Sequence, residues 1–254
     1  MEKLLIITRF SILISQDICF RQNRYADLEQ KKKDLFAESR MKERFWLFEN
    51  VCLKSLANQT DTNFIHLVFT SKHLPDIYKQ QLEQLRERFS FNIYYIDTNI
   101  YEMVNLIKSQ FYKDNKLIAT ARLDDDDALN KDFVKIIISK YYNESNDESF
   151  VSFPHGVIFS YKNPNKLHMA PFEFKNIALG QTYFSRKLTV FEWGHHHKVD
   201  ELKSVIYDNT PKMYLVHAGP TCDSQRELKK GALIKDSKNH YLFGYEYMPL
   251  SKID

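Results

Sequence analysis

Short apolar runs alternate with helical patterns through the first half of the chain, and this alternation constrains the fold more than any other feature. Four runs, typical of strands buried on both faces, lie at residues 4–8, 64–70, 93–96 and 117–123. Segments with helical apolar spacing lie between and after them, at residues 41–57, 76–89, 101–111 and 131–142. Alternation at this spacing predicts an α/β fold with a mostly parallel, Rossmann-like central sheet flanked by helices.

The second half of the chain has a different pattern. Residues 150–153 and 157–161 are strand-like and flank Pro154-His155-Gly156, which predicts a hairpin. Further strands are expected at residues 167–174, 183–186 and 213–216. We therefore expect one domain over residues 1–254, with a regular first half to about residue 130 and an irregular second half.

Charge and cysteine usage exclude several classes of protein. The 36 basic and 33 acidic residues give a net charge of +3, which does not indicate a nucleic-acid partner. The odd number of cysteines, with no C-x-x-C pair, argues against a disulfide scaffold and fits a reducing cytoplasm. No apolar stretch reaches the roughly 18–20 residues of a membrane span, so any action at the inner membrane is expected to be peripheral, on its cytoplasmic face.

Four consecutive carboxylates, Asp124 to Asp127, follow the fourth apolar run. Two unit charges ~4 Å apart interact by about 1 kcal/mol in water and about 4 kcal/mol at an effective dielectric of 20, so such a run at a strand end needs positive charge nearby. Arg122 offsets part of it, and a divalent cation would offset more. Mg²⁺ and Mn²⁺ favour oxygen ligands and leave positions for a diphosphate, so this acidic run predicts a site for Mn²⁺ or Mg²⁺. The alternative is a solvated loop or helix cap.

Three stretches together resemble a known family. They are Thr8-Arg9-Phe10-Ser11, the helix with Arg44-Phe45 and the segment from Ser55 to Thr60, and Arg122-Leu123 followed by the acidic run, Ala128 and Leu129. In this order they are similar to the putative rhamnosyltransferases of bacterial polysaccharide gene clusters, over about residues 3–250. The resemblance implies a GT-A-like glycosyltransferase fold, with residues 1–130 binding a nucleotide sugar and residues 131–254 binding an acceptor.

The resemblance also implies roles for single residues. Asp124, with Arg9, Arg122 and Asp125, would bind the donor. Asp126 would be the principal metal ligand, with Asp125 or Asp127 secondary and Asp124 as a further candidate. Ala178-Leu179-Gly180-Gln181-Thr182 looks like the glycine loop of such enzymes, so Gly180 would face the donor. Glu192 falls where the catalytic base is expected, although the usual acidic pair is reduced to one carboxylate. His217 is the candidate for a late histidine on the metal.

Aromatic and histidine side chains near Glu192 are candidates for the acceptor site. Trp193 would serve as a platform for a sugar ring or pack in the core. His195 and His197 could share one face of a strand, whereas three adjacent histidines cannot all face one metal. An independent zinc site is the weaker interpretation, because such sites draw ligands from several segments.

The resemblance implies an enzyme that transfers a sugar, rhamnose by the family's name, from a UDP-, dTDP- or GDP-sugar to a glycan or lipid-linked glycan of a capsule or lipopolysaccharide. Inversion of the anomeric centre is expected, with retention left open. Two alternatives are a nucleotidyltransferase of sugar activation and a non-catalytic protein of glycan binding or capsule assembly. The first usually needs a glycine-rich basic loop after the first strand, which residues 9–12 do not form.

Overall fold

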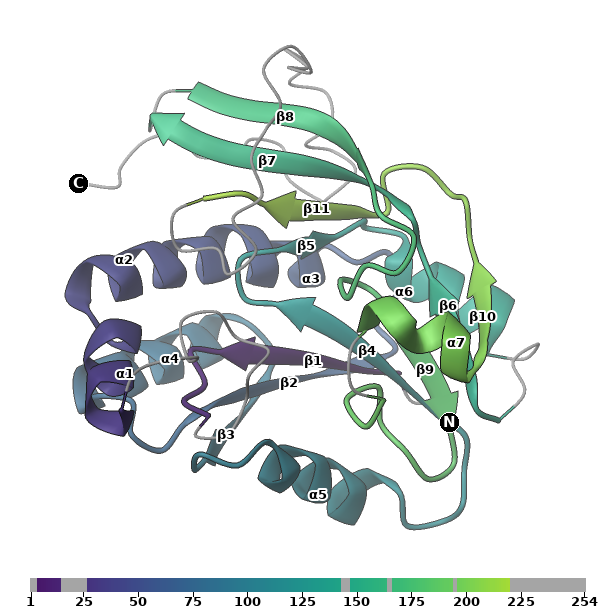
Figure 1. Cartoon of the computed structure of the whole chain (residues 1–254), viewed down its shortest axis with the longest axis horizontal. Coiled ribbons are helices and arrows are strands. Elements are labelled where there is room, and N and C mark those ends of the chain that lie inside the picture. Colours follow the sequence, from purple (N-terminus) through teal and green to yellow (C-terminus); the bar gives the residue numbers. More distant parts are fainter. Residues whose placement is uncertain (1–3, 15–26, 143–146, 164–165, 194–195, 220–254) are drawn as a thin grey trace.

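The computed structural model describes residues 4–14, 27–142, 147–163, 166–193 and 196–219. The four apolar runs of the first half become neighbouring parallel strands of a seven-stranded sheet (Figure 1). The strand order is β10-β6-β9-β4-β1-β2-β3, and only β9 runs antiparallel to its neighbours. These strands are β1 (Leu4–Phe10), β2 (Phe64–Ser71), β3 (Asn92–Ile96), β4 (Ile118–Asp124), β6 (Ser149–Ser152), β9 (Thr182–Ser185) and β10 (Ser204–Tyr207). The predicted α/β class, with a mostly parallel sheet flanked by helices, is confirmed.

Helices cover both faces of this sheet. The longer ones are α1 (Leu28–Leu35), α2 (Glu38–Leu47), α4 (Asp76–Arg88) and α5 (Ile100–Phe111). A π-helical stretch (Phe48–Leu53) continues α2 into α3 (Lys54–Ala57), and the shorter elements are α6 (Phe133–Ile136), a second π-helical stretch (Ile137–Tyr141), a 3-10 turn (His196–Lys198) and α7 (Val199–Leu202). Helix α5 packs Met103 and Ile107 on one face of the sheet, and α2 packs Met41 and Phe45 on the other. Among the described helices, none is both long and apolar enough for a membrane crossing.

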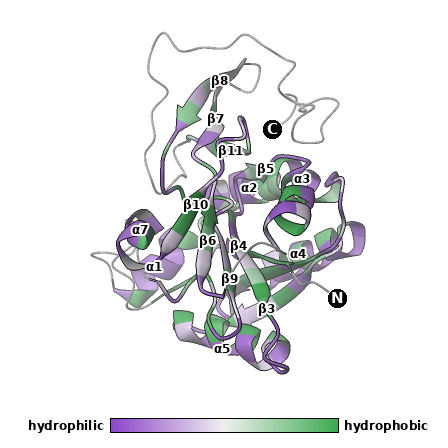
Figure 2. Ribbon diagram, turned by 90° about the vertical axis from the view of Figure 1, so that its right-hand side faces the viewer, coloured by the Kyte–Doolittle hydropathy of each residue, from purple (hydrophilic) through white to green (hydrophobic). Residues whose placement is uncertain are grey.

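A second sheet of four strands lies over α2, on the side away from the larger sheet (Figure 1). Its order is β5-β11-β7-β8, with β5 (Ala128–Leu129), β7 (His155–Asn163), β8 (Lys166–Glu173) and β11 (Tyr214–His217). Figure 2 shows β7 and β8 extending away from the larger sheet, with α5 on the opposite side of the molecule. Leu47 and Val51 pack against Val157 and Leu215, so the helix is held between the two sheets.

The predicted hairpin around Pro154-His155-Gly156 is wrong. Strand β6 pairs with β9 and β10 in the larger sheet, whereas β7 pairs with β8 and β11 in the smaller one. The chain changes sheets between them, and Tyr214 fills the space beside Gly156, where an added Cβ atom would lie 2.1 Å from the ring. The Tyr214 hydroxyl also donates to the Pro154 carbonyl at 2.9 Å.

Candidate functional site

The acidic run lies at the carboxyl end of β4, in the middle of the larger sheet. Asp124 ends the strand, and the Asp127 amide donates to the Asp124 carbonyl at 3.2 Å, which folds the run into a turn before β5. Strand β1 is the neighbour, with Arg9 paired in register to Asp124. Ligands of open α/β sheets bind beyond the carboxyl ends of the strands, so this turn occupies the expected position of a ligand site.

Arg44, from α2, neutralises the inner part of the run. Its guanidinium makes two contacts with Asp125, one of them Nε to Oδ2 at 3.1 Å, and Nη1 lies 2.7 Å from Asp126 Oδ2. The side chains of Arg44, Asp125 and Asp126 are only 7%, 3% and 7% exposed. A bidentate arginine–carboxylate pair fixes the orientation of both side chains as well as neutralising their charges. The positive charge that the sequence demands is therefore supplied in part by the chain itself.

Arg44 was not predicted as a site residue, although it belongs to the stretches that carry the family resemblance. A signal was present: Arg44 lies on the buried face of α2 between Met41 and Phe48, which are both fully buried. A charged residue on an apolar helical face is almost never fully buried unless it is paired. Its partner Asp125 lies 81 residues away along the chain, so spacing could not identify it.

His217 reaches the run from the smaller sheet, at the end of β11. Its Nδ1 lies 3.1 Å from Asp126 Oδ2, and its backbone amide donates to Asp127 Oδ1 at 2.7 Å. Burial raises the pKa of Asp126, but the charge of Arg44 and the hydrogen bond with His217 outweigh it, so this pKa lies well below its usual value. Asp126 is therefore ionised over the whole neutral range.

The described residues contain no group of three or more histidine, cysteine or acidic side chains arranged to hold a metal. Asp126 and His217 nevertheless offer one oxygen and one nitrogen donor side by side, 3.1 Å apart and shielded from solvent. Mg²⁺ and its relatives commonly take one or two protein ligands and complete their shell with water and substrate phosphates. Asp126 and His217, which contact each other and of which Asp126 also pairs with Arg44, would be two such ligands.

Asp124 and Arg9 form the outer part of the site. Arg9 Nη2 lies 3.4 Å from Asp124 Oδ1, and the two side chains are 19% and 44% exposed. The guanidinium carbons of Arg9 and Arg122 lie 5.3 and 4.8 Å from the ring centroid of Phe191. Arg122 also donates to the Val190 carbonyl at 2.5 Å. These contacts leave Asp124 accessible and hold Arg9 beside it.

Gly180 anchors the predicted glycine loop to β4. Its amide donates to the Arg122 carbonyl at 2.8 Å, and the Arg122 amide donates to the Gln181 carbonyl at 3.2 Å. Gly180 has a φ of +71°, and an added Cβ would lie 3.2 Å from Leu129 and Phe133 side-chain atoms. Glycine is the residue that tolerates this conformation at no steric cost.

Glu192 and Trp193 lie on the side of the larger sheet that α5 covers, and Trp193 packs against a cluster that includes Phe150 of β6. The Glu192 carboxylate accepts from the Thr189 amide at 2.6 Å and from Lys108 Nζ, in α5, at 3.0 Å. Trp193 packs edge-on against Tyr183, with ring centroids 5.3 Å apart. Of the two histidine candidates, His197 is described through its backbone in the 3-10 turn, and His195 lies outside the described residues.

Comparisons with known proteins identify one matching family model and several solved structures of low sequence identity. A family model described as "Putative rhamnosyl transferase" matches residues 3–230. The crystal structure of S. aureus TarS 1–349 is 14% identical, with 86% of this chain and 61% of that chain covered and a TM-score of 0.43. The same fragment in complex with UDP-GlcNAc is 13% identical, with 90% and 62% covered and a TM-score of 0.43. This chain thus spans less than two thirds of that fragment. A comparison with curated proteins finds no match.

Proposed function

The chain belongs to the family described as putative rhamnosyl transferases, and from this premise we propose that it moves a sugar from a nucleotide-sugar donor to a glycan acceptor in a metal-dependent, inverting reaction. The observation that carries the proposal is the division of the acidic run. Asp126 is buried beside His217, while Asp124 stays 44% exposed beside Arg9, all at the carboxyl ends of β1 and β4.

The outer residues would bind the donor. Asp124 presents a carboxylate that accepts hydrogen bonds from sugar or ribose hydroxyls, and Arg9 presents a guanidinium suited to phosphate oxygens. Phe191 and the loop at Gly180 hold the two arginines and the end of β4 in position. Side chains held in this way need little reordering when the donor arrives, which preserves binding free energy.

Asp126 and His217 would hold a Mn²⁺ or Mg²⁺ ion, which when bound supplies Lewis-acid stabilisation of the departing diphosphate. Arg44 keeps Asp126 and Asp125 ionised and fixed in orientation. Because these side chains are shielded from water, their charges act on the reacting phosphates more strongly than exposed charges would.

Glu192 is the proposed base. In a single displacement, an acceptor hydroxyl oxygen bonds to the anomeric carbon as the bond to the diphosphate breaks, and the hydroxyl proton passes to the Glu192 carboxylate. Lys108 and the Thr189 amide fix that carboxylate in one orientation. Proton transfer at this position requires the acceptor to approach along the side of the sheet that faces α5.

The cellular setting is part of the same proposal and is supported by the chain's membership of the family. We place the transfer in the synthesis of a cell-surface polysaccharide, such as a capsule or lipopolysaccharide, with a glycan or lipid-linked glycan as acceptor. The enzyme would work in the cytoplasm or peripherally at the inner membrane.

A donor panel tests the proposal. The purified chain would be incubated with UDP-, dTDP- and GDP-sugars and Mn²⁺, and release of nucleoside diphosphate would be followed. At least one donor should turn over, EDTA should stop the reaction, and Asp126→Asn should lower the rate by about 10²–10³-fold, as is typical when one preorganised electrostatic group is removed. Turnover that persists both in EDTA and in Asp126→Asn would contradict a metal role.

A further inference from the structure

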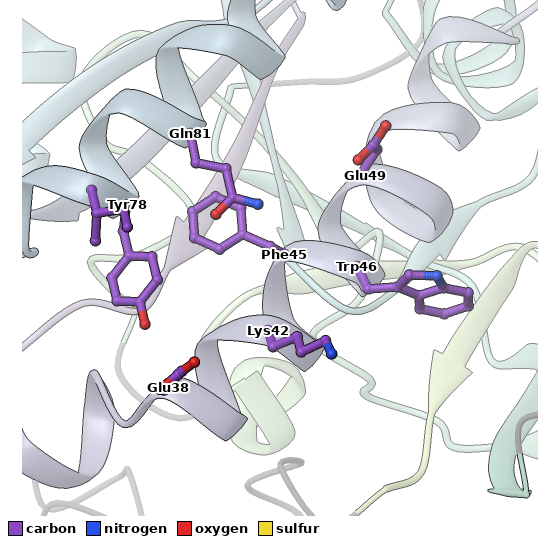
Figure 3. Close-up of a pocket in the computed structure, with 8 residues that line it drawn as sticks. Glu38, Lys42, Phe45, Trp46, Glu49, Tyr78 and Gln81 are labelled. Carbon is purple, nitrogen blue, oxygen red and sulfur yellow. The ribbon is translucent and has the colours of Figure 1, made fainter. Parts of the chain in front are cut away.

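A cavity of about 600 Å³ lies between α2 and α4, and it shares no lining residue with the acidic run. Helix α2 nevertheless contributes residues to both. Arg44 contacts Asp125 and Asp126, and the next residue, Phe45, lines the cavity. In Figure 3, Tyr78 and Gln81 come from α4, and Phe45 and Lys42 come from α2. The volume lies within the range of small-molecule sites, about 300–1,000 Å³.

The lining combines aromatic surface with hydrogen-bonding groups. Tyr78 and Trp46 are the partly exposed aromatic side chains, and Phe45, only 3% exposed, packs against Tyr78 with ring centroids 5.8 Å apart and planes at 32°. Glu38 and Gln81 supply carboxylate and amide groups at the same cavity. A sugar ring has apolar C–H faces and a rim of hydroxyls, so aromatic surface beside polar groups matches its two kinds of surface.

Charge selects among possible ligands. The cavity is lined by two carboxylates, Glu38 and Glu49, and one ammonium group, Lys42, and Glu49 also pairs with Arg88 at 2.7 Å. With Arg88 counted, the positive and negative groups balance, so the cavity carries no excess positive charge of the kind that would favour a phosphate or nucleotide over a neutral ligand. Burial and then the negative charge of Glu38 raise the pKa of Tyr78, so its hydroxyl keeps its proton and can donate to a ligand oxygen.

We propose that this cavity binds a neutral sugar ring of the glycan acceptor, remote from the ring that receives the new sugar. The inference rests on the proposed function for the identity of the acceptor. Its role is to hold a remote ring on the α2 side of the larger sheet, while the acceptor passes over the carboxyl ends of β1 and β4 to bring its reacting hydroxyl to Glu192 on the α5 side. The cavity would therefore contribute to acceptor affinity and not to the chemical step.

Direct binding tests the proposal without any donor. Methyl α-L-rhamnopyranoside, maltotriose and N,N′-diacetylchitobiose would be titrated into the chain while NMR signals of the Trp46 and Trp193 indoles and of the backbone are followed. At least one saccharide should shift the Trp46 signal and α4 resonances around Gln81. No binding by any of the three, or shifts confined to Trp193 and the acidic run, would overturn the proposal.

Two adjacent glutamines of α4 provide a matched pair of variants. Gln81 lines the cavity and Gln80 does not, and both are exposed, so neither substitution should unfold the chain. Gln81→Ala should weaken saccharide binding at least threefold, Tyr78→Ala should weaken it at least tenfold, and Gln80→Ala should leave it unchanged. Equal affinities in Gln81→Ala and Gln80→Ala would overturn the proposal. So would a monomer–dimer shift caused by Tyr78→Ala in sedimentation velocity, since a second copy would then be the occupant.

Saccharide binding and sugar transfer, measured separately, distinguish this inference from the proposed function. Asp126→Asn, which should lower the rate of transfer by about 10²–10³-fold, should bind the saccharide as the unmodified chain does. Where transfer is measurable, Gln81→Ala should raise the acceptor KM at least threefold with kcat and the donor KM unchanged. Binding without any transfer would contradict the proposed function and leave the cavity assignment standing, whereas transfer with an unchanged acceptor KM would contradict the cavity assignment alone.

Discussion

The inner and outer parts of the acidic run consist of the same residue type, yet the structure treats them differently. Asp125 and Asp126 are 3% and 7% exposed and share the buried Arg44, whereas Asp124 is 44% exposed and pairs with Arg9 across 3.4 Å. An ion pair in the interior must recover a large desolvation cost through close geometry, while an exposed pair is worth little to stability. A ligand can compete for Arg9 and Asp124 far more easily than for Arg44.

This difference separates two tasks within four neighbouring residues. The inner carboxylates, with Arg44, define the shape and charge of the turn, and in the proposed function Asp126 would bind an ion. The outer carboxylate would bind the donor. Breaking the inner pair should therefore damage the fold, and breaking the outer pair should damage binding.

The largest effect is expected from Arg44→Met. It would leave Asp125 and Asp126 buried without their cation, and removing one partner of a buried pair costs about 3–5 kcal/mol. Urea unfolding followed by circular dichroism measures the loss. Arg9→Met is the matched control, since it removes an arginine from the outer pair and should change the free energy of unfolding by about 0–1 kcal/mol. Equal losses in the two variants would remove the distinction between inner and outer parts.

Asp124→Asn should weaken donor binding and leave the stability of the chain almost unchanged. It keeps the size of the side chain but removes the charge that we assign to donor binding, so the donor KM should rise about tenfold, equivalent to about 1.4 kcal/mol. The free energy of unfolding should change by less than about 0.5 kcal/mol, as for most surface substitutions. Steady-state kinetics and urea unfolding on the same preparation check both parts. An unchanged KM with a large loss of stability would reverse the assignment.

The smallest effect concerns Asp208, a buried carboxylate whose cation is exposed. Its side chain is 4% exposed and lies 3.0 Å from the Nζ of Lys140, which is 54% exposed. Burial raises the pKa of Asp208, but hydrogen bonds from Thr210, Tyr141 and Lys140 outweigh it and lower the pKa to about 2. Because the folded pKa lies below the unfolded value of about 3.9, the stability from Asp208 is present above pH 4 and is lost as the pH falls toward 2.

Acid unfolding measures this effect. Asp208→Asn should flatten the fall in stability between about pH 4 and pH 2, relative to the unmodified chain. Asp114→Asn, at an exposed position, serves as the control and should leave the curve unchanged. An acid curve that is the same with and without Asp208 would show that its hydrogen bonds do not favour the ionised form.

The sequence predicted what depends on local pattern. Apolar runs located β1 to β4 and the helices between them, and four adjacent aspartates at a strand end marked the turn that the structure places at the centre of the sheet. Each of these signals lies within a few residues and needs no knowledge of which segments meet. His217 was suggested by the family resemblance, which implies a late histidine on the metal.

What the sequence did not reveal depends on contacts between distant segments. Arg44 meets Asp125 across 81 residues, and Lys108 meets Glu192 across 84. The two strands around Pro154 and Gly156 were assigned to one hairpin because local pattern does not say which sheet a strand joins. Only the pairing of β6 with β9 and of β7 with β11, together with Tyr214 packed against Gly156, determines that choice.

The central claim is that Asp126, buried and ionised, is a ligand of a divalent ion that also binds the diphosphate of a donor. Electron paramagnetic resonance of Mn²⁺, titrated with the chain in the presence and absence of UDP, dTDP or GDP, tests it most directly. At least one nucleotide should strengthen Mn²⁺ binding, and Asp126→Asn should weaken that binding by at least about tenfold, while Asp132→Asn should not. Mn²⁺ affinity that is the same in Asp126→Asn and the unmodified chain, with every nucleotide, would contradict the claim.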